Sequence, residues 1–155
     1  MKEHVYRLAV TWTGNRGEGT RTYAGYARDH VIEAAGKPAI PGSSDPAFRG
    51  DPARWNPEEL LLASLSACHK LWYLHLCAAA KLVVLTYRDE AEAVMTEDAS
   101  GAGRFVRAVL RPSVSFVAGA DLERAAALHH DAHRYCFIAN SVNFPVLCEP
   151  VLVIG

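Results

Sequence analysis

Residues 56–80, NPEELLLASLSACHKLWYLHLCAAA, carry the clearest structural signal in the chain. Asn56 can cap a helix, Pro57 suits the first helical position, and two glutamates stand in the first turn, where the helix dipole favours negative charge. This pattern predicts a helix from Glu58 to about Ala80. Because its leucines and aromatic residues cover nearly every face, we expect the helix to be buried all round.

The helix is long enough to span a membrane, but its middle contains His69 and Lys70, and His75 follows. Such side chains are costly in hydrocarbon. We therefore expect a core helix that a second subunit buries further, and no membrane association.

Strand-forming residues precede the helix. Residues 5–13 and 20–26 predict an opening β-hairpin, because a glycine-rich turn signal separates them. A third short strand includes residues 31–33. Residues 36–57 hold five of the eight prolines and predict a long, functional loop.

The second half of the chain also predicts both strands and a helix. The valine-rich runs 82–96 and 103–117 predict a second hairpin, Asp121 caps an amphipathic helix to about Tyr135, and residues 145–154 predict a closing strand. The order βββ-α-ββ-α-β predicts an α+β fold in a single domain, residues 1–155.

Composition narrows the functional classes. The 155 residues are 50% hydrophobic and carry a formal net charge of −1, which gives no electrostatic reason to bind nucleic acid or an anionic membrane. The first residues show no signal-peptide pattern, so we expect a cytoplasmic protein.

Four cysteines stand at 68, 77, 136 and 148, without the CxxC spacing of many metal and redox sites. Free cysteines are among the most buried residue types, so a core position is the commonest outcome. Cys77 lies nine residues beyond Cys68, which places it on the opposite helical face at about 3.6 residues per turn. We assign Cys77, and Cys148 in its Val/Leu-rich strand, to the core.

A structural metal site is one alternative function. His129, His133 and Cys136 fall at i, i+4 and i+7 on one helical face and could hold a transition metal with a further ligand. Their polar neighbours make a solvated face at least as good an interpretation.

His69 follows Cys68 directly, and adjacent helical residues do not face each other, so we interpret His69 as a core or interface histidine. We expect no metal and no cofactor.

Two separated motifs resemble those of the OsmC/Ohr family. Its members carry Asn-Pro-Glu, nine intervening residues and then a reactive cysteine, and Glu58 and Cys68 keep that spacing. The segment 132–136, followed by Asn140-Ser141, is similar to the family's second-cysteine segment. Chain length and element order agree from end to end.

The resemblance implies a homodimer with a pocket at the subunit interface, where a reactive cysteine meets an arginine, a glutamate and a second cysteine. Carried over, the cysteines are Cys68 and Cys136 and the glutamate is Glu58. The arginine is Arg16, which follows the first strand, or Arg49, which lies in the long loop; Arg16 is slightly favoured.

The activity implied is that of a thiol peroxidase. Only a thiolate attacks peroxide, and a free thiol with a pKa near 8.5 is mostly protonated at neutral pH, so a guanidinium beside the sulfur would favour attack. A sulfenic acid on Cys68 would condense with Cys136, and an external dithiol of the lipoyl type would reopen the disulfide. Organic hydroperoxides would be preferred to hydrogen peroxide. The rival function is a non-catalytic module that binds a small hydrophobic ligand at the dimer interface.

The sequence departs from the family in two places. Phe137 replaces the proline that often follows the second cysteine, which leaves the backbone less constrained, and residues 69–73 are bulkier than usual, so we expect a reshaped pocket.

Glu58 and Cys68 are about 15 Å apart along one straight helix. We therefore expect Glu58 and the arginine to face Cys68 across the interface of an obligate twofold dimer.

Overall fold

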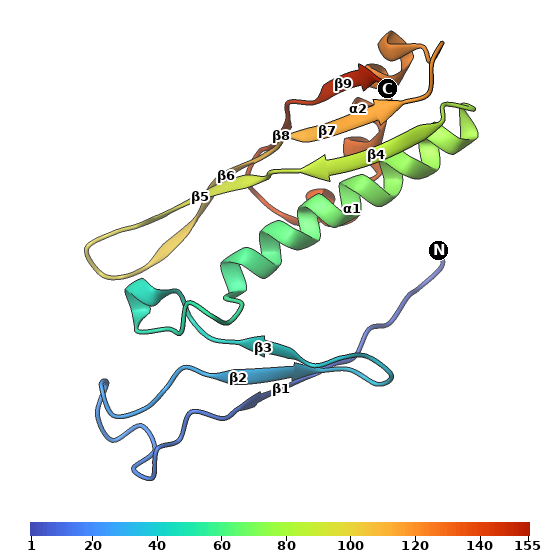
Figure 1. Cartoon of the computed structure of the whole chain (residues 1–155). Coiled ribbons are helices and arrows are strands. Elements are labelled where there is room, and N and C mark those ends of the chain that lie inside the picture. The colour runs from blue at the N-terminus through green and yellow to red at the C-terminus, as the bar shows by residue number, and fades with distance from the viewer. The chain divides into compact units, whose positions relative to one another are not determined.

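The computed structural model describes all 155 residues. It contains two α-helices and nine short strands, the latter in three sheets of three (Figure 1). The chain divides into two compact units, residues 1–61 and 62–155, and each is described by itself. The predicted α+β class is confirmed. Neither helix has the combination of length and apolar character needed to cross a lipid bilayer.

The first unit holds an antiparallel sheet of β1 (Ala9–Trp12), β2 (His30–Glu33) and β3 (Ile40–Gly42), in that order (Figure 1). The predicted hairpin between residues 5–13 and 20–26 is wrong. β1 pairs with β2, and residues 20–26 form turns.

Arg28 gives the physical reason for these turns. Its guanidinium donates hydrogen bonds to the carbonyl oxygens of Tyr23 and Tyr26, at 2.6 and 2.5 Å. Those carbonyls are therefore satisfied without a neighbouring strand, which stabilises the turns. Just beyond the paired strands, the Ala27 N–H donates to the Gly14 carbonyl at 2.9 Å, and only glycine fits there, because a Cβ would lie 1.9 Å from the carbonyl oxygen of Ala27.

The predicted loop of residues 36–57 contains more regular structure than expected, namely β3 and a short 3₁₀ helix, Pro46–Phe48. Arg54 ties the segment to the sheet, since its guanidinium donates to the carbonyls of Gly42 and His30, both at 2.9 Å. The loop is thus an ordered part of the first unit.

Helix α1 (Pro57–Ala79) begins and ends within a residue of the prediction. Its first turn has a reciprocal cap: the Glu59 N–H donates to Asn56 Oδ1 at 2.8 Å, and the Asn56 N–H donates to Glu59 Oε2 at 3.3 Å. The expectation of burial all round is wrong for the single chain. Only every fourth residue from Leu65 to Cys77 is buried, and Leu71 is 62% exposed.

The second unit contains the two predicted valine-rich runs as one antiparallel ribbon, but each run is broken in two. β4 pairs with β7 and β5 pairs with β6, while the closing segment adds β8 parallel to β6 and β9 parallel to β7. The six strands are β4 (Val84–Asp89), β5 (Glu92–Glu97), β6 (Gly103–Leu110), β7 (Pro112–Phe116), β8 (Val146–Cys148) and β9 (Val151–Ile154).

All three breaks occur at the same level of the ribbon, which separates the sheets β4-β7-β9 and β5-β6-β8 (Figure 1). Asp89 replaces a ladder bond there, because its Oδ1 accepts the Arg111 N–H at 2.6 Å. Pro112 and Pro150, which have no N–H to donate, stand beside the breaks. Prolines and a side-chain acceptor therefore interrupt strands that the valine pattern predicted as continuous.

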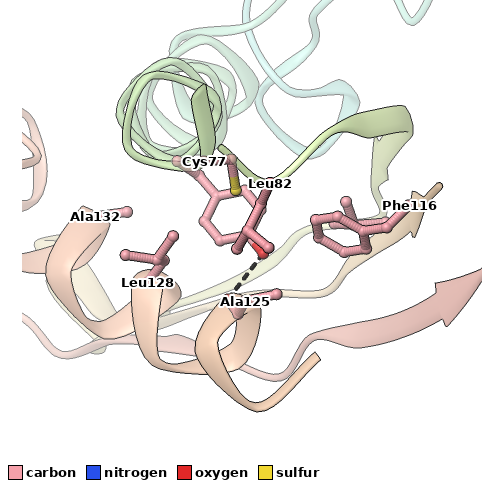
Figure 2. Packing of buried hydrophobic residues seen from close by; sticks show 8 residues of the cluster. Cys77, Leu82, Phe116, Ala125, Leu128 and Ala132 are labelled. Atoms are coloured by element: carbon pink, nitrogen blue, oxygen red, sulfur yellow. Dashed lines mark hydrogen bonds between the residues drawn. The ribbon is translucent and has the colours of Figure 1, made fainter. Parts of the chain in front are cut away.

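Helix α2 (Leu122–Tyr135) matches the prediction, including its cap, since Asp121 Oδ1 accepts the Arg124 N–H at 3.0 Å. It packs its buried face against α1 and the sheet. Figure 2 shows Leu128 and Ala132 of α2 facing Cys77 of α1, with Leu82 and Phe116 beside them. Cys77 is 1% exposed, so its assignment to the core is confirmed.

Candidate functional site

The two cysteines singled out from the sequence lie together in the second unit. Cys68, midway along α1, is half-buried, and Cys136, at the C-terminal cap of α2, is 1% exposed. Burial raises the pKa of the Cys136 thiol to about 11, and the neighbouring Cys68 raises it further through a hydrogen bond and through charge. The Ala139 N–H, 3.4 Å from the sulfur, partly offsets this.

This asymmetry gives the two thiols different chemistry. A buried thiol with a raised pKa stays protonated at neutral pH and is a poor nucleophile. Cys68 is the more accessible of the two and has Cys136 beside it as a reaction partner. The pair is suited to oxidation of the accessible sulfur followed by disulfide formation with the buried one.

Residues near the two cysteines in the sequence form an aromatic cluster. Trp72 lies one helical turn after Cys68, and its ring centroid lies 5.1 Å from that of Tyr135 and 5.6 Å from that of Phe137, the two residues that flank Cys136. Phe137 therefore meets a packing partner where the family often has proline. The same tryptophan lines an apolar hollow of about 240 Å³ with Leu71 and His75.

Both candidate arginines belong to the first unit and line one pocket there, of about 350 Å³. Arg49 has a left-handed backbone, with φ of 65°. Neither Arg16 nor Arg49 forms an ion pair, although Arg49 lies 5.9 Å from the ring centroid of Tyr23. Their guanidinium groups remain available to an anion.

A third arginine of the pocket, Arg28, was missed from the sequence. Its guanidinium stacks over the rings of Tyr26 and Tyr23, at 3.8 and 4.5 Å from the centroids, and donates to the carbonyls of both residues. Only the recurrence of tyrosines two and five residues before it could have indicated this. Arg28 shapes the pocket and adds to its positive charge.

Glu58 is half-buried in the first turn of α1 and makes no hydrogen bond or ion pair within the chain, whereas its neighbour Glu59 is held by the helix cap. Because α1 is continuous, Glu58 and Cys68 are separated by ten residues, or about 15 Å of helical rise. Glu58 therefore cannot reach the cysteine of its own chain directly.

A second polar cluster lies in the core of the second unit. His69 Nε2 and His129 Nδ1 are 2.9 Å apart, and Cys148 Sγ lies 3.7 and 3.8 Å from these atoms. His69 is buried and hydrogen-bonded, as predicted. Cys148 is half-buried beside two histidines, so its assignment as an ordinary core residue is wrong.

The metal-ligand set considered from the sequence also contains the wrong residues. Of His129, His133 and Cys136, only His129 belongs to the group of ligand atoms that converge, and its companions are His69 and Cys148. Helical spacing alone indicated a shared face, but the partners of His129 come from α1 and β8, which no local pattern could connect to it.

Burial controls the protonation of this cluster. Desolvation lowers the pKa of His69 to about 4, against a smaller raising effect of Asp89, and lowers the pKa of His129 to about 3. Desolvation likewise raises the pKa of Cys148 to about 12. At neutral pH both imidazoles are uncharged and the thiol is protonated.

This chain is similar to a known protein family and to several solved structures. The family model described as OsmC-like protein matches residues 50–150, and the chain belongs to that family. A solved OsmC-like protein of unknown function from Vibrio cholerae is similar over 97% of this chain and 100% of its own, with 34% identity and a TM-score of 0.83.

More distant structures share the fold. An organic hydroperoxide resistance protein from Elizabethkingia anophelis is 18% identical over 99% of this chain and 100% of its own, with a TM-score of 0.68. One from Bacillus subtilis is 20% identical over 95% and 98% of the two chains, with a TM-score of 0.59. Comparison with curated protein sequences gives no match.

Proposed function

We propose that the protein is a thiol peroxidase that reduces organic hydroperoxides, and hydrogen peroxide less efficiently, with Cys68 as the attacking residue and Cys136 as the resolving residue. The observation that carries the proposal is the pairing of an accessible thiol with a buried, protonated one. Membership of the OsmC family supports it, as does the shared fold with proteins named for organic hydroperoxide resistance.

The reaction has two steps in the protein. The Cys68 thiolate attacks one peroxide oxygen, the O–O bond breaks, and the leaving alkoxide takes up a proton as an alcohol, which leaves a sulfenic acid on Cys68. Cys136 then forms the S–S bond, and its proton leaves with the sulfenic hydroxyl as water. An external dithiol, of the lipoyl type in this proposal, exchanges with the disulfide and restores both thiols.

The arginine pocket would stabilise the thiolate. Arg16 or Arg49 would pair with the sulfur, and Glu58 would hold that guanidinium through a charge-assisted hydrogen bond. The lack of carboxylate partners for either arginine, and of any partner for Glu58, supports these roles. Because Glu58 cannot reach its own Cys68, we assign the glutamate and the arginine to the cysteine of a second chain.

The first unit supports a twofold dimer on energetic grounds. No apolar side chain among residues 1–61 is buried, and Val10 and Trp12 of β1 are 60% and 42% exposed. An isolated three-stranded sheet needs a covered hydrophobic face for stability. A second copy of the chain would supply that cover, and the half-exposed α1 would gain the additional burial expected of it.

Mass spectrometry tests the proposal most directly. Reduced protein is treated with one equivalent of cumene hydroperoxide, and the disulfides are mapped after alkylation and digestion. We expect a Cys68–Cys136 link and one equivalent of alcohol. If the peroxide persists and both thiols are alkylated, the protein is not a peroxidase, and the rival function of binding a hydrophobic ligand would then be favoured.

Assembly is tested by mixing two inactive chains. Glu58→Ala and Cys68→Ser subunits, co-expressed with different tags, should form a heterodimer in which one site carries both lesions and the other carries none. Activity should return to about half that of the wild type. A heterodimer without activity, or a fully active monomer in sedimentation, would contradict the shared site.

A further inference from the structure

The His69–His129–Cys148 cluster is not used by the proposed peroxidase chemistry. Its three donor atoms come from α1, α2 and β8, which lie far apart in the sequence and meet in the second unit. Two imidazoles and a thiolate form a ligand set typical of zinc and copper sites. We propose that this cluster is a zinc site, in which His69 Nε2, His129 Nδ1, Cys148 Sγ and one water molecule bind one Zn²⁺ ion.

The distances fit such a site. With Zn–N of about 2.05 Å, Zn–S of about 2.3 Å and tetrahedral angles, the nitrogens should be about 3.3 Å apart and the sulfur about 3.6 Å from each. The two S···N distances are 3.7 and 3.8 Å. The N···N distance of 2.9 Å is shorter, because the two nitrogens share a hydrogen bond. On zinc binding that proton would move to the other nitrogen of its own ring, the Cys148 thiol proton would pass to solvent, and the rings would turn and open by a few tenths of an ångström.

The surroundings favour a cation of charge +2. Asp89 lies close enough to act electrostatically on both His69 and Cys148. It is fixed there because its Oδ2 accepts the Ser66 Oγ–H at 2.6 Å and its Oδ1 accepts the Arg111 N–H. A Zn²⁺ ion, the Cys148 thiolate and the Asp89 carboxylate together carry no net charge, which limits the cost of burying the ion.

Packing orients the ligands. The Tyr73 ring stacks on His129 with centroids 3.6 Å apart and planes inclined by 10°, and its hydroxyl donates to the Ala125 carbonyl. This fixes the imidazole plane before any ion binds. Cys148 is only half-buried and provides the route of entry. Because His69 follows Cys68 and His129 precedes Cys136 on α2, the ion would fasten together the two helices that carry the thiol pair.

The sequence predicted no metal, so the test begins with stoichiometry. Untagged protein is grown with zinc, and the bound metal is measured by elemental analysis. Chelator-stripped, reduced protein is then titrated with Zn²⁺ against a chromophoric chelator, and with Co²⁺ as a spectroscopic probe. We expect one ion per chain, visible cobalt bands of a tetrahedral site, and a thiolate-to-cobalt charge-transfer band.

Matched variants distinguish this site from the alternatives. His129→Asn and Cys148→Ser should each weaken zinc binding by about 100-fold or more, since even partners outside the ligand shell are worth 10–100-fold. His130→Asn, at an exposed neighbouring position, should bind as the wild type does. Cys136→Ser should also retain zinc, whereas the ligand set drawn from helical spacing would lose it.

Several results would overturn the proposal. These are wild-type protein without zinc binding tighter than micromolar, a cobalt spectrum without the charge-transfer band, or zinc affinity that survives Cys148→Ser. Stoichiometric binding of Cu⁺ without Zn²⁺ would overturn the assignment to a divalent ion. Far-ultraviolet circular dichroism of each stripped variant verifies that it is folded, and the wild-type titration decides the question without any variant.

Discussion

The buried histidine pair should make the stability of the protein fall steeply in mild acid. His69 and His129 are 1% and 3% exposed, and their rings contact each other. Burial lowers the pKa of His69 to about 4, with Asp89 opposing and His133 adding to the shift, and lowers the pKa of His129 to about 3, with His69 adding to it. The unfolded chain protonates both residues near pH 6.5, whereas the folded protein keeps them neutral.

The sign and size follow from proton linkage. Below about pH 6.5 the unfolded state binds more protons than the native state, so the free energy of unfolding decreases as the pH falls, down to about pH 4 for His69. Each histidine contributes about 1.4 kcal/mol per pH unit in this window. Between about pH 7 and pH 5 the loss is roughly 2 kcal/mol per histidine, or about 4 kcal/mol for the pair, against a typical total of 5–15 kcal/mol.

Urea denaturation of reduced, chelator-treated protein at several pH values measures this loss. The variant His129→Gln removes one of the two groups, so its free energy of unfolding should fall about 1.4 kcal/mol less per pH unit than that of the wild type. His130→Gln is the matched control, since that residue is exposed and should leave the slope unchanged. Parallel pH profiles for the wild type and His129→Gln would show that the buried His129 does not cause the loss of stability.

Three further predictions concern single side chains. Cys136→Ser should allow one turnover and then expose Cys68 to irreversible oxidation, so mass spectrometry that finds no sulfinic or sulfonic acid after repeated peroxide would remove the resolving role. Cys77→Ala should lower the melting temperature without changing the peroxidase rate, because Cys77 is a core residue; a loss of rate at unchanged melting temperature would contradict this. Asp121→Ala should lower the free energy of unfolding by about 1 kcal/mol, since it removes the cap of α2. A denaturation midpoint equal to that of the wild type would show that the cap contributes nothing to stability.

Local signals were sufficient for some elements. The bounds of both helices were predicted to within a residue, from the caps Asn56 and Asp121 and from the apolar spacing after each cap. This was possible because a helix is stabilised by contacts between residues close in sequence. The first hairpin could not be predicted in this way. The partner of β1 is β2, some twenty residues on, and the intervening turns depend on how Arg28 binds two carbonyls.

For the candidate site, the sequence indicated Cys68 and Cys136 as a reactive pair, because the spacing from Glu58 to Cys68 and the segment ending in Cys136 resemble motifs of a known family, and their catalytic roles stay a prediction. The packing of the folded chain determined which cysteine is accessible and which is buried. It also decided that His69, His129 and Cys148 converge. Burial and contact between distant segments are properties of packing, and a pattern that extends over a few helical turns carries no information about them.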